Sequence, residues 1–442
     1  MVAAVLATPK GWPAVLLGRA GHYDPEAGLA PAEKAGAWKA WHDALKMGPE
    51  ALVRLVDDAG LRGRGGSGYP TAAKWRAVRA QPGTVRYAVG NAYEADPGVR
   101  AVRALLELDP VAVVEGLALA AFAVGAREAY LAVRADSTDA LRRLRLAVEQ
   151  AEAAGYLGHD IEGSGVDLQL EVRAVEGAFV LGEETVLLRA LEGKRGMPEQ
   201  RPPYPAERGL WGEPTLVNSA VTLADLPWIV SRGAKAFRSI GASEFPGTLL
   251  VQLSGAVKRP GVAEVPTGTP IGEVIEKVGG SDPDRLKAVL VGGPSGGFLP
   301  PAALSTGLTP RSLEAAGAIL GSGSLVALDD GACVVELATL MERFMNDESC
   351  GKCIPCRIGT RRLTEIGERF MGGRSRPSDP QLLADLSVDV RDGSLCGHGI
   401  TAPNPLTSAM RYFEAEFQEH AQRGRCPAGV CRPLRVAAGG AR

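Results

Sequence analysis

Three cysteines at C-x₂-C-x₂-C spacing constrain this chain more than any other feature of its sequence. Cys350, Cys353 and Cys356 lie in ESCGKCIPCR, and Cys396 follows later in DGSLCGHG. A tight loop of this kind places three thiolates at three corners of a [4Fe–4S] cube and leaves the fourth corner to a remote residue. Zinc also binds four cysteines, but its usual pattern is two separate cysteine pairs. The spacing therefore predicts that these four residues bind a [4Fe–4S] cluster.

The other cysteines are also confined to the last quarter of the chain. A disulfide framework would spread the 7 cysteines more evenly and would favour an even number. His420, Cys426 and Cys431 offer one nitrogen and two sulfurs within a short segment, and Cys333 is a candidate fourth ligand. This set is typical of a small zinc site. The alternative is that the C-terminal thiols are idle in a reducing cytosol, and the sequence leaves both interpretations open.

Composition excludes several classes of protein. The 442 residues carry a net charge of −2, so no basic excess indicates a nucleic-acid partner. Hydrophobic residues make up 45%, enough for a sizeable core and too many for a disordered chain. The most apolar run, 111–126, contains Glu115 and is shorter than the ~20 residues that a membrane span needs. No basic leader precedes the first apolar residues, so we expect a soluble, cytoplasmic protein.

The first half of the chain alternates between strand-like and helix-like sequence. Strands are predicted at 85–98, where the strand ends in a loop, and at 126–134 and 166–175, with helices at 111–126 and 138–155 between them. A β-α-β-α order favours an α/β fold in which helices cover a parallel sheet. We therefore expect a Rossmann-like nucleotide-binding domain in this part of the chain.

The pattern changes twice further along the chain. From about residue 240, β-rich runs surround a Lys-Arg-Pro-Gly turn and are followed by a short helix and another strand, which predicts a β-grasp (ubiquitin-like) module that binds a soluble ligand. From residue 331 the sequence becomes helical again, which predicts a helical bundle around the cluster. The predicted domains are a helical extension at 1–58, the α/β domain at 59–240, the β-grasp module at 241–330 and the bundle at 331–442.

Two polar segments interrupt the predicted α/β domain. GLRGRGGSGYPTAAKW (60–75) is dense in glycine and is followed by helix-forming sequence, so its backbone and its flanking cations suit a phosphate. It matches neither G-x-G-x-x-G nor a Walker loop, which makes it a weak motif by itself. The second segment is GEE (182–184), which is either a solvated loop or a set of acceptors for a nucleotide. A flavin is a natural companion of an iron–sulfur cluster, because it splits a two-electron donor into single electrons.

Together these segments resemble the flavin-bearing, NADH-oxidising subunit of respiratory complex I. They also resemble its relatives in multisubunit NAD-linked and electron-bifurcating hydrogenases and formate dehydrogenases. The motifs that carry the resemblance are GLRGRGGSGYPTAAKW, EGAFVLGEETVLLRALEGKRGMP, PPYPAERGLWGEPTLVNSAVTLADLP, LSGAVKRPGVAEVP and ESCGKCIPCRIGT. They cover nearly the whole chain from about residue 20. The segments SLCGHGITAPNP and HAQRGRCPAGVC are more similar to the hydrogenase-type beta subunit, in which the distal cysteines and a histidine are associated with zinc.

The resemblance implies FMN in the α/β domain, NAD(P)H as the substrate above the flavin, and single electrons leaving through the [4Fe–4S] cluster. It implies no acid–base residue, because the flavin carries the chemistry. The residues implied around FMN are Gly63, Arg64, Gly65, Gly66, Lys74, Asn91, Glu94, Gly182, Glu183, Glu184, Asn218, Ser219 and Thr222. Those implied at the nucleotide are Asp96, Glu184, Arg201 and Tyr204.

Several positions depart from the family's pattern. Tyr93 stands where the family has an aspartate that supports the flavin, and its ring either closes the pocket or stacks beside it. Ala77 stands where an aromatic residue is associated with the adenine end of the nucleotide. The milder departures are Asp96 for glutamate, Ser219 for asparagine, Arg201 for lysine and Tyr204 for phenylalanine.

Two functions compete on these grounds. The intact glycine loop and GEE favour an NAD(P)H dehydrogenase subunit of a larger oxidoreductase. Tyr93 and Ala77 favour an electron-relay subunit that keeps the cluster but has lost FMN or nucleotide oxidation. The family implies two partners, a thioredoxin-like [2Fe–2S] subunit and a larger iron–sulfur subunit that carries the terminal catalyst, such as a hydrogenase or a formate dehydrogenase. It implies contact with the inner membrane face only through such partners, without direct membrane insertion.

Overall fold

The fold is that of a computed structural model, which describes residues 4–431 and residue 434. The chain divides into two compact units. The first comprises the chain up to Ala95 together with Val99–Val251 and Val262–Thr269. The second comprises Asp96–Gly98, Gln252–Gly261 and the chain from Pro270 onward. The four predicted domains differ from this division and remain predictions.

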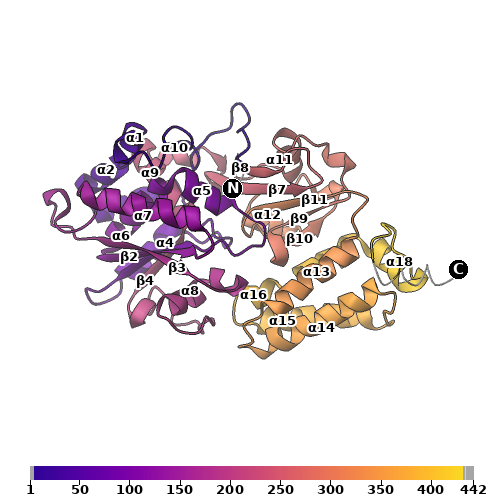
Figure 1. Ribbon diagram of the computed structural model, residues 1–442. Helices are drawn as coiled ribbons and strands as arrows, with labels where there is room; N and C mark the ends of the chain where they lie inside the picture. Colours follow the sequence, from indigo (N-terminus) through magenta and orange to yellow (C-terminus); the bar gives the residue numbers. More distant parts are fainter. Residues whose placement is uncertain (1–3, 432–433, 435–442) are drawn as a thin grey trace. The chain divides into compact units, whose positions relative to one another are not determined.

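A four-stranded parallel sheet forms the centre of the first unit (Figure 1). Its strands are β1 (Tyr87–Ala92), β2 (Glu128–Arg134), β3 (Gln169–Val175) and β4 (Thr215–Ser219). The strand order is β3-β2-β1-β4, so the chain moves outward from β1 through β2 to β3 and then returns to the other side of β1. This confirms the predicted α/β class and places a topological switch point between β1 and β4.

Ten helices of the described chain belong to the first unit. They are α1 (Leu29–Lys34), α2 (Lys39–Met47), α3 (Pro49–Ala59), α4 (Thr71–Arg79), α5 (Ala101–Leu108), α6 (Pro110–Val124), α7 (Thr138–Ala153), α8 (Glu184–Leu191), α9 (Ala220–Arg232) and α10 (Ala234–Arg238). A short hairpin of β5 (Gly241–Ala242) and β6 (Phe245–Pro246) follows them.

Helix α6 shows why the core of this unit forms where it does. Asp109 accepts a hydrogen bond from the Ala112 backbone N–H, and Pro110 occupies the first turn, so the helix begins there. Gly125 ends it in the left-handed region with φ 74°. All but one of its residues are buried, because α6 packs against α7, α9 and the sheet (Figure 1). The helix forms the centre of the core.

The N-terminal segment joins the same core and is not a separate layer. Trp38 and Trp41, in and just before α2, are fully buried and belong to the hydrophobic cluster that surrounds α6. Residues 1–58 are predicted to be a helical extension. Large apolar side chains nevertheless contribute strongly to core stability wherever they occur in the chain.

The second unit combines strands with a helical layer. The second sheet has the order β10-β9-β11-β7-β8, formed by β7 (Thr248–Gly255), β8 (Gly261–Pro266), β9 (Ala288–Val291), β10 (Gly297–Leu299) and β11 (Ser324–Leu328). Strands β9, β10 and β11 belong to the second unit, whereas the first half of β7 and most of β8 are grouped with the first. Strand β11 pairs antiparallel with β9 and parallel with β7. The helices are α11 (Ile271–Lys277), α12 (Pro310–Ala315), α13 (Val334–Asp347), α14 (Ile354–Met371), α15 (Asp379–Gly393), α16 (Gly397–Thr401), α17 (Asn404–Tyr412) and α18 (Glu414–Arg423).

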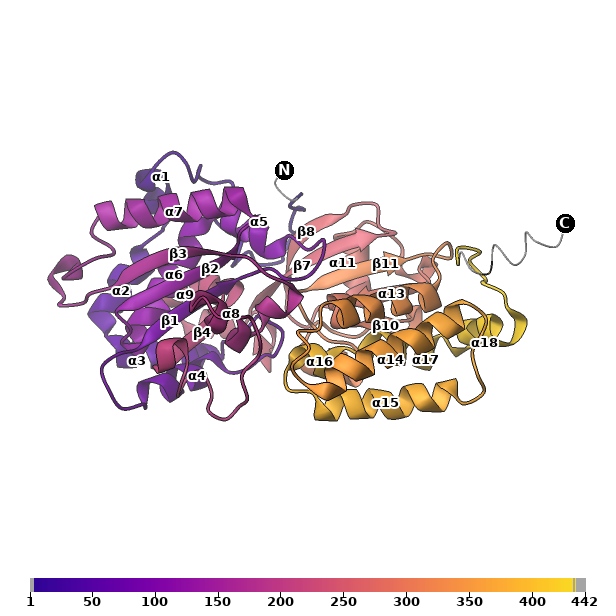
Figure 2. The same cartoon turned by 60° about the horizontal axis from the view of Figure 1, so that its bottom comes forward.

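Helices α13, α14 and α15 lie side by side (Figure 2). Small residues permit this close packing. A Cβ atom on Gly367 of α14 would lie 2.8 Å from the Thr339 hydroxyl of α13. The predicted helical bundle is therefore confirmed. No helix among the described residues has the length and hydrophobicity of a membrane span.

Candidate functional site

The glycine loop connects α3 to α4 and closes on itself. The Gly63 N–H donates to the Tyr69 carbonyl at 2.8 Å, and the Thr71 N–H donates to the Leu61 carbonyl at 3.0 Å. Gly66, at the tip, has φ 106°, which a residue with a side chain adopts only under strain. Among the described residues, nothing accepts a hydrogen bond from the backbone N–H of Gly65 or Gly66. The loop therefore presents free donors at its tip.

Arg64 lies in this loop, but its guanidinium points into the protein. The side chain is 1% exposed, and its Nε lies 3.3 Å from Asp225 Oδ2. The guanidinium also donates to the Pro246 carbonyl and stacks on Phe245 at 4.4 Å. Burial raises the pKa of Asp225 to about 7, against the opposing effect of Arg64. Only the backbone of Arg64 is therefore available at the loop surface.

The loop tip lies beside the carboxyl end of β4. A Cβ atom on Gly65 would lie 3.5 Å from the Cβ of Ser219, the last residue of β4. Ser219 caps α9 by accepting from the Thr222 N–H at 3.3 Å, and Thr222 Oγ1 accepts from the Arg64 N–H at 2.8 Å. The preceding residue, Asn218, accepts from Trp75 Nε1 at 2.9 Å. Loop, strand end and helix start thus form one connected structure.

The end of β1 lies next to this structure. Asn91 of β1 pairs in register with Ser219 of β4, so both lie at the same edge of the sheet. Ligands of open α/β sheets bind outside the carboxyl ends of the strands, at the point where the strand order reverses. That point lies between β1 and β4. The predicted glycine loop, Asn91, Asn218 and Ser219 therefore meet where this fold binds nucleotides.

The GEE segment supplies the charged wall of the site. Glu183 caps α8 by accepting from the N–H groups of Thr185 and Val186, at 2.9 Å and 3.0 Å. Glu184 lies between two cations: its Oε2 is 2.9 Å from Lys74 Nζ, and its Oε1 is 3.0 Å from an Arg201 nitrogen. Glu184 is therefore ion-paired and half-buried, which favours the binding interpretation over a solvated loop.

Other predicted site residues are engaged elsewhere. The Glu94 carboxylate accepts from the N–H groups of Val102 and Arg103 at the start of α5, at 2.6 Å and 3.3 Å. Asp96 groups with the second unit, where it accepts a hydrogen bond from Ser322, and burial raises its pKa to about 6. Tyr204 is 54% exposed. No described contact connects these three residues to Glu184 or Lys74.

Sequence reasoning missed two supporting residues. Trp75 holds Asn218, and Val217 offers its carbonyl to Lys74 Nζ at 3.2 Å. The Lys-Trp pair within the first motif was a usable signal for Trp75. Nothing in the sequence marks the Val217 carbonyl, because every residue has one.

The four predicted cluster cysteines meet at the ends of helices in the second unit. Cys353 precedes α14, Cys356 lies in its first turn and Cys396 precedes α16. A Cβ atom on Gly399 of α16 would lie 3.0 Å from the Cβ of Cys356, so α16 brings Cys396 close to the loop. Burial raises the pKa of Cys356 to about 12, and the charges of Cys353, Cys396 and Cys350 add to this effect. The remote cysteine thus joins the three in the loop, as a cubane cluster requires.

Cys333, His420, Cys426 and Cys431 form a second group of ligand atoms. All four are buried, and their ligand atoms lie within 4.8 Å of one another. His420 Nε2 is 3.5 Å from Cys333 Sγ and 3.4 Å from Cys431 Sγ. His420 Nδ1 lies 2.8 Å from the Glu416 carbonyl, which directs Nε2 toward the sulfurs. The chain therefore brings Cys333 together with the C-terminal residues.

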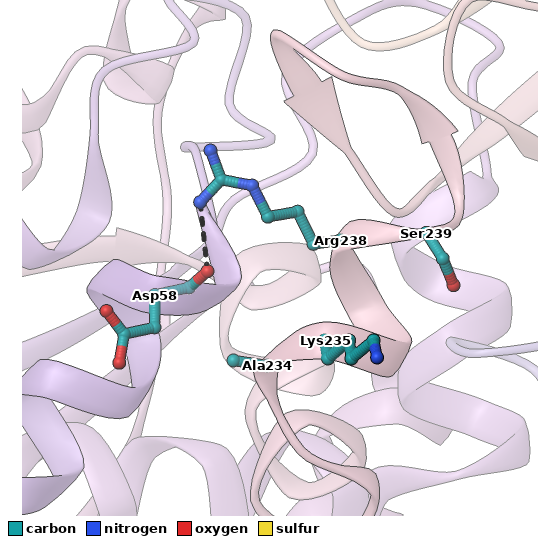
Figure 3. A pocket seen from close by; sticks show the side chains of 5 residues that line it. All are labelled: Asp58, Ala234, Lys235, Arg238 and Ser239. Carbon is teal, nitrogen blue, oxygen red and sulfur yellow. Dashed lines mark hydrogen bonds between the residues drawn. The ribbon is translucent and has the colours of Figure 1, made fainter.

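A surface pocket of the first unit contains none of the predicted site residues. Asp58, Ala234, Lys235, Arg238 and Ser239 line it (Figure 3). Arg238 donates to the Asp58 backbone carbonyl at 3.1 Å, and the Lys235 side chain runs in a different direction. Binding pockets have polar groups that converge on one point, and these residues do not converge.

Known protein families match three parts of the chain. Residues 56–228 match the Nuo51 FMN-binding domain, and residues 336–420 match the iron–sulfur binding region of NADH-ubiquinone oxidoreductase-F. Residues 250–299 match the SLBB domain. The first region contains the glycine loop and GEE, and the second contains the four cluster cysteines and His420.

Individual proteins are similar over most of the chain. The HndC subunit of the NADP-reducing hydrogenase of Solidesulfovibrio fructosivorans is 43% identical over 88% of this chain and 80% of that protein. The F 2 subunit of the NADH-quinone oxidoreductase of Rhizobium meliloti is 40% identical over 90% of this chain and 96% of that protein. A solved NAD⁺-reducing [NiFe]-hydrogenase, in the H₂-reduced state, aligns with TM-score 0.81 and 33% identity over 95% of this chain and 68% of that chain.

Proposed function

The chain belongs to the family of flavin- and iron–sulfur-binding subunits that includes HndC of the NADP-reducing hydrogenase and the F subunits of NADH-quinone oxidoreductases, and we propose that the carboxyl ends of β1 and β4, together with the glycine loop, form its FMN site. It is an NAD(P)H-oxidising electron-transfer subunit of a multisubunit oxidoreductase. When bound, FMN and the [4Fe–4S] cluster supply hydride acceptance and single-electron transfer. The observation that carries the residue assignment is the glycine loop, whose free N–H donors lie at the sheet's switch point.

The donors of the glycine loop and of Lys74 fit a flavin phosphate. The N–H groups of Gly65 and Gly66 would donate to phosphate oxygens, and Lys74 would add a positive charge. Gly63 shapes the loop, and Arg64 holds it through the buried contact with Asp225. Asn91, Gly182, Asn218, Ser219 and Thr222 would form the wall around the rest of the molecule. Glu94 would act indirectly, because its carboxylate holds the start of α5.

Glu183, Glu184 and Arg201 would orient the nicotinamide nucleotide. Glu184 is held on both sides by cations, so its position is fixed before the substrate arrives. Tyr204 is exposed, and its ring would lie against the nucleotide as it enters. Asp96 would contribute only through its loop, since its carboxylate is bound to Ser322.

The competing function, an electron relay without FMN, is favoured by Tyr93 and Ala77, and the structure describes the surroundings of Tyr93. The Tyr93 side chain is 5% exposed, and its hydroxyl donates to the Gly177 carbonyl at 2.5 Å. The ring is therefore buried, and its hydroxyl is bound to the segment that leads into GEE. This geometry supports the dehydrogenase function over the relay.

Cofactor content tests the proposed FMN site. We expect anaerobically purified protein to contain about one FMN and four irons per chain. Gly66→Ala should lower the FMN content and leave the iron content unchanged, because it forces a side chain into a backbone with φ 106°. Gly83→Ala is the matched control, since Gly83 has φ 91° in the same unit and open space around it. Four irons without FMN in the unmodified protein would favour the relay.

The [4Fe–4S] site lies close to a surface suited to partner docking. Ile354 and Ile358 of α14 are 66% and 46% exposed, and their spacing puts them on one helix face. Exposed apolar side chains beside a redox centre favour a protein contact. We propose that a thioredoxin-like [2Fe–2S] subunit or a larger iron–sulfur subunit docks here, in a cytoplasmic complex. Ile358→Glu should weaken co-purification of the partner at unchanged iron content, whereas Leu382→Glu on α15 should not.

We propose that Cys333, His420, Cys426 and Cys431 bind zinc. Bond lengths of about 2.3 Å for Zn–S and 2.0 Å for Zn–N imply S···N separations of roughly 3.5 Å in a tetrahedral site. The separations of His420 Nε2 from two of the sulfurs are 3.5 Å and 3.4 Å. His420→Ala should remove zinc and leave iron in place, and Cys356→Ser should do the reverse. Loss of both metals in both variants would contradict two independent sites.

A further inference from the structure

The segment that leads into GEE is held at both of its ends by residues at the end of β1. Tyr93 donates its hydroxyl to the Gly177 carbonyl at 2.5 Å. Asn91 donates its side-chain N–H to the Gly182 carbonyl at 2.9 Å. Segment 177–182 thus starts at one of these hydrogen bonds and ends at the other.

The Tyr93 side chain is itself fixed. Its backbone N–H donates to Asn91 Oδ1 at 3.1 Å, so one asparagine orients Tyr93 and also holds Gly182. The Arg134 guanidinium lies over the Tyr93 ring at 5.9 Å and donates to the Glu94 carbonyl at 3.2 Å. Little rotational freedom remains for a ring that is 5% exposed and held on these sides.

We infer that Tyr93 is a positioning residue, which together with Asn91 clamps segment 177–182 and thereby fixes Glu183 and Glu184. The segment is short, and Glu183 follows it directly as the N-cap of α8. A shift at Gly177 therefore moves the start of α8, and Glu184 moves with it. The inference deepens the proposed function in one respect, because the consequence for the nucleotide rests on the proposed role of Glu184.

The clamp gives the aromatic residue at this position a structural role. The ring is buried, and its hydroxyl gives the exposed Gly177 carbonyl a partner within the protein in place of water. Phenylalanine would fill the same space and leave that carbonyl to solvent, so the hydrogen bond between Tyr93 and the segment would be lost. The hydroxyl alone is therefore the part of Tyr93 that the clamp requires.

Tyr93→Phe is the test, with Tyr130→Phe as the matched control. Tyr130 of β2 is 8% exposed, and its hydroxyl donates to Glu128 Oε2 at 2.7 Å, away from the segment. Amide hydrogen exchange of the full chain, with and without added FMN, should be about tenfold faster across 177–187 in Tyr93→Phe. The control should match the unmodified chain there. Asn91→Ala, which removes the other hydrogen bond, should accelerate exchange in the same peptide.

A double-substitution cycle separates positioning from general support of the fold. If Tyr93 acts through Glu184, then Tyr93→Phe raises the KM for NAD(P)H about tenfold in the unmodified background and has little effect in Glu184→Gln. Equal effects in both backgrounds would overturn the positioning role, as would unchanged exchange across 177–187. Failure of the unmodified chain to bind FMN would contradict the proposed function instead. The exchange measurement would still show whether Tyr93 holds segment 177–182.

Discussion

Replacing Glu342 is expected to stabilise the cluster-bearing helices, whereas most core substitutions destabilise a protein. Glu342 lies on α13 with 0% exposure, and neither of its carboxylate oxygens has a hydrogen-bond partner among the described residues. Burial without a compensating cation raises its pKa well above the ordinary value. The side chain is therefore held as a neutral acid whose polar atoms gain nothing from their surroundings.

The expected change in the free energy of unfolding has two parts, one independent of pH and one dependent on it. An unsatisfied buried polar group costs about 1–3 kcal/mol, so Glu342→Met should raise the free energy of unfolding by about that amount. The unfolded chain loses the Glu342 proton near pH 4.5, whereas the folded chain keeps it to higher pH. Above pH 4.5 the folded state therefore binds more protons, and stability falls by up to about 1.4 kcal/mol per pH unit until the folded pKa is reached.

Urea unfolding of the purified holoprotein between about pH 5.5 and 8.5 measures both parts. Circular dichroism follows the helices, and cluster absorbance follows the second unit. Glu342→Gln should abolish the pH dependence of the unfolding free energy that Glu342 causes, but it keeps a buried polar group. Glu342→Met should abolish that pH dependence and also raise the unfolding free energy by the pH-independent amount. Glu314→Gln, at an exposed position on α12, should change neither. The reasoning is refuted if Glu342→Met is less stable than the unmodified chain at neutral pH, or if Glu342→Gln keeps the slope.

Two further predictions concern packing and charge in the first unit. Gly116→Ala should lower the free energy of unfolding by about 1–3 kcal/mol in thermal or urea unfolding, because its Cβ would lie 2.0 Å from the Leu223 carbonyl oxygen. Gly272→Ala on α11 is the control: its Cβ would meet nothing closer than 3.4 Å, so this change should be neutral or stabilising. Lys74→Met should weaken FMN binding about tenfold or more in a fluorescence titration, since it removes the cation 2.9 Å from Glu184. Unchanged affinity would place the phosphate away from Lys74.

The features that sequence predicted best are those that depend on spacing. The C-x₂-C-x₂-C loop predicts that a fourth cysteine from a distant part of the chain lies beside it, and α16 brings Cys396 close to the loop. The order of strands and helices predicted a parallel sheet, and β1, β2, β3 and β4 are parallel. Spacing along the chain limits what a local segment can form, so these inferences needed no knowledge of distant contacts.

The direction of individual side chains was not predictable in this way. Arg64 lies in a glycine-rich loop that suits an anion, yet its guanidinium is buried against Asp225, a residue 161 positions away. The carboxylate of Glu94, a residue predicted to lie near the flavin, accepts hydrogen bonds at the start of α5. In both cases a tertiary contact decides which way the side chain points, and neither contact leaves a pattern in the local sequence. Tyr93 follows the same rule, since only the fold brings its hydroxyl to Gly177.

The arrangement of charge is consistent with separate places for the phosphate and the nucleotide in the proposed site. Lys74, Glu183, Glu184 and Arg201 form a connected group of two cations and two anions, so the group has no net charge. A neutral group neither attracts nor repels a phosphate strongly at a distance, but its fixed dipoles orient a polar ring that lies against it. The glycine loop, by contrast, offers the N–H donors of Gly65 and Gly66, which have no acceptor among the described residues. In the proposed arrangement a phosphate would therefore gain most at the loop, with Lys74 beside it, and Glu183 and Glu184 would be left for the nicotinamide end of the substrate.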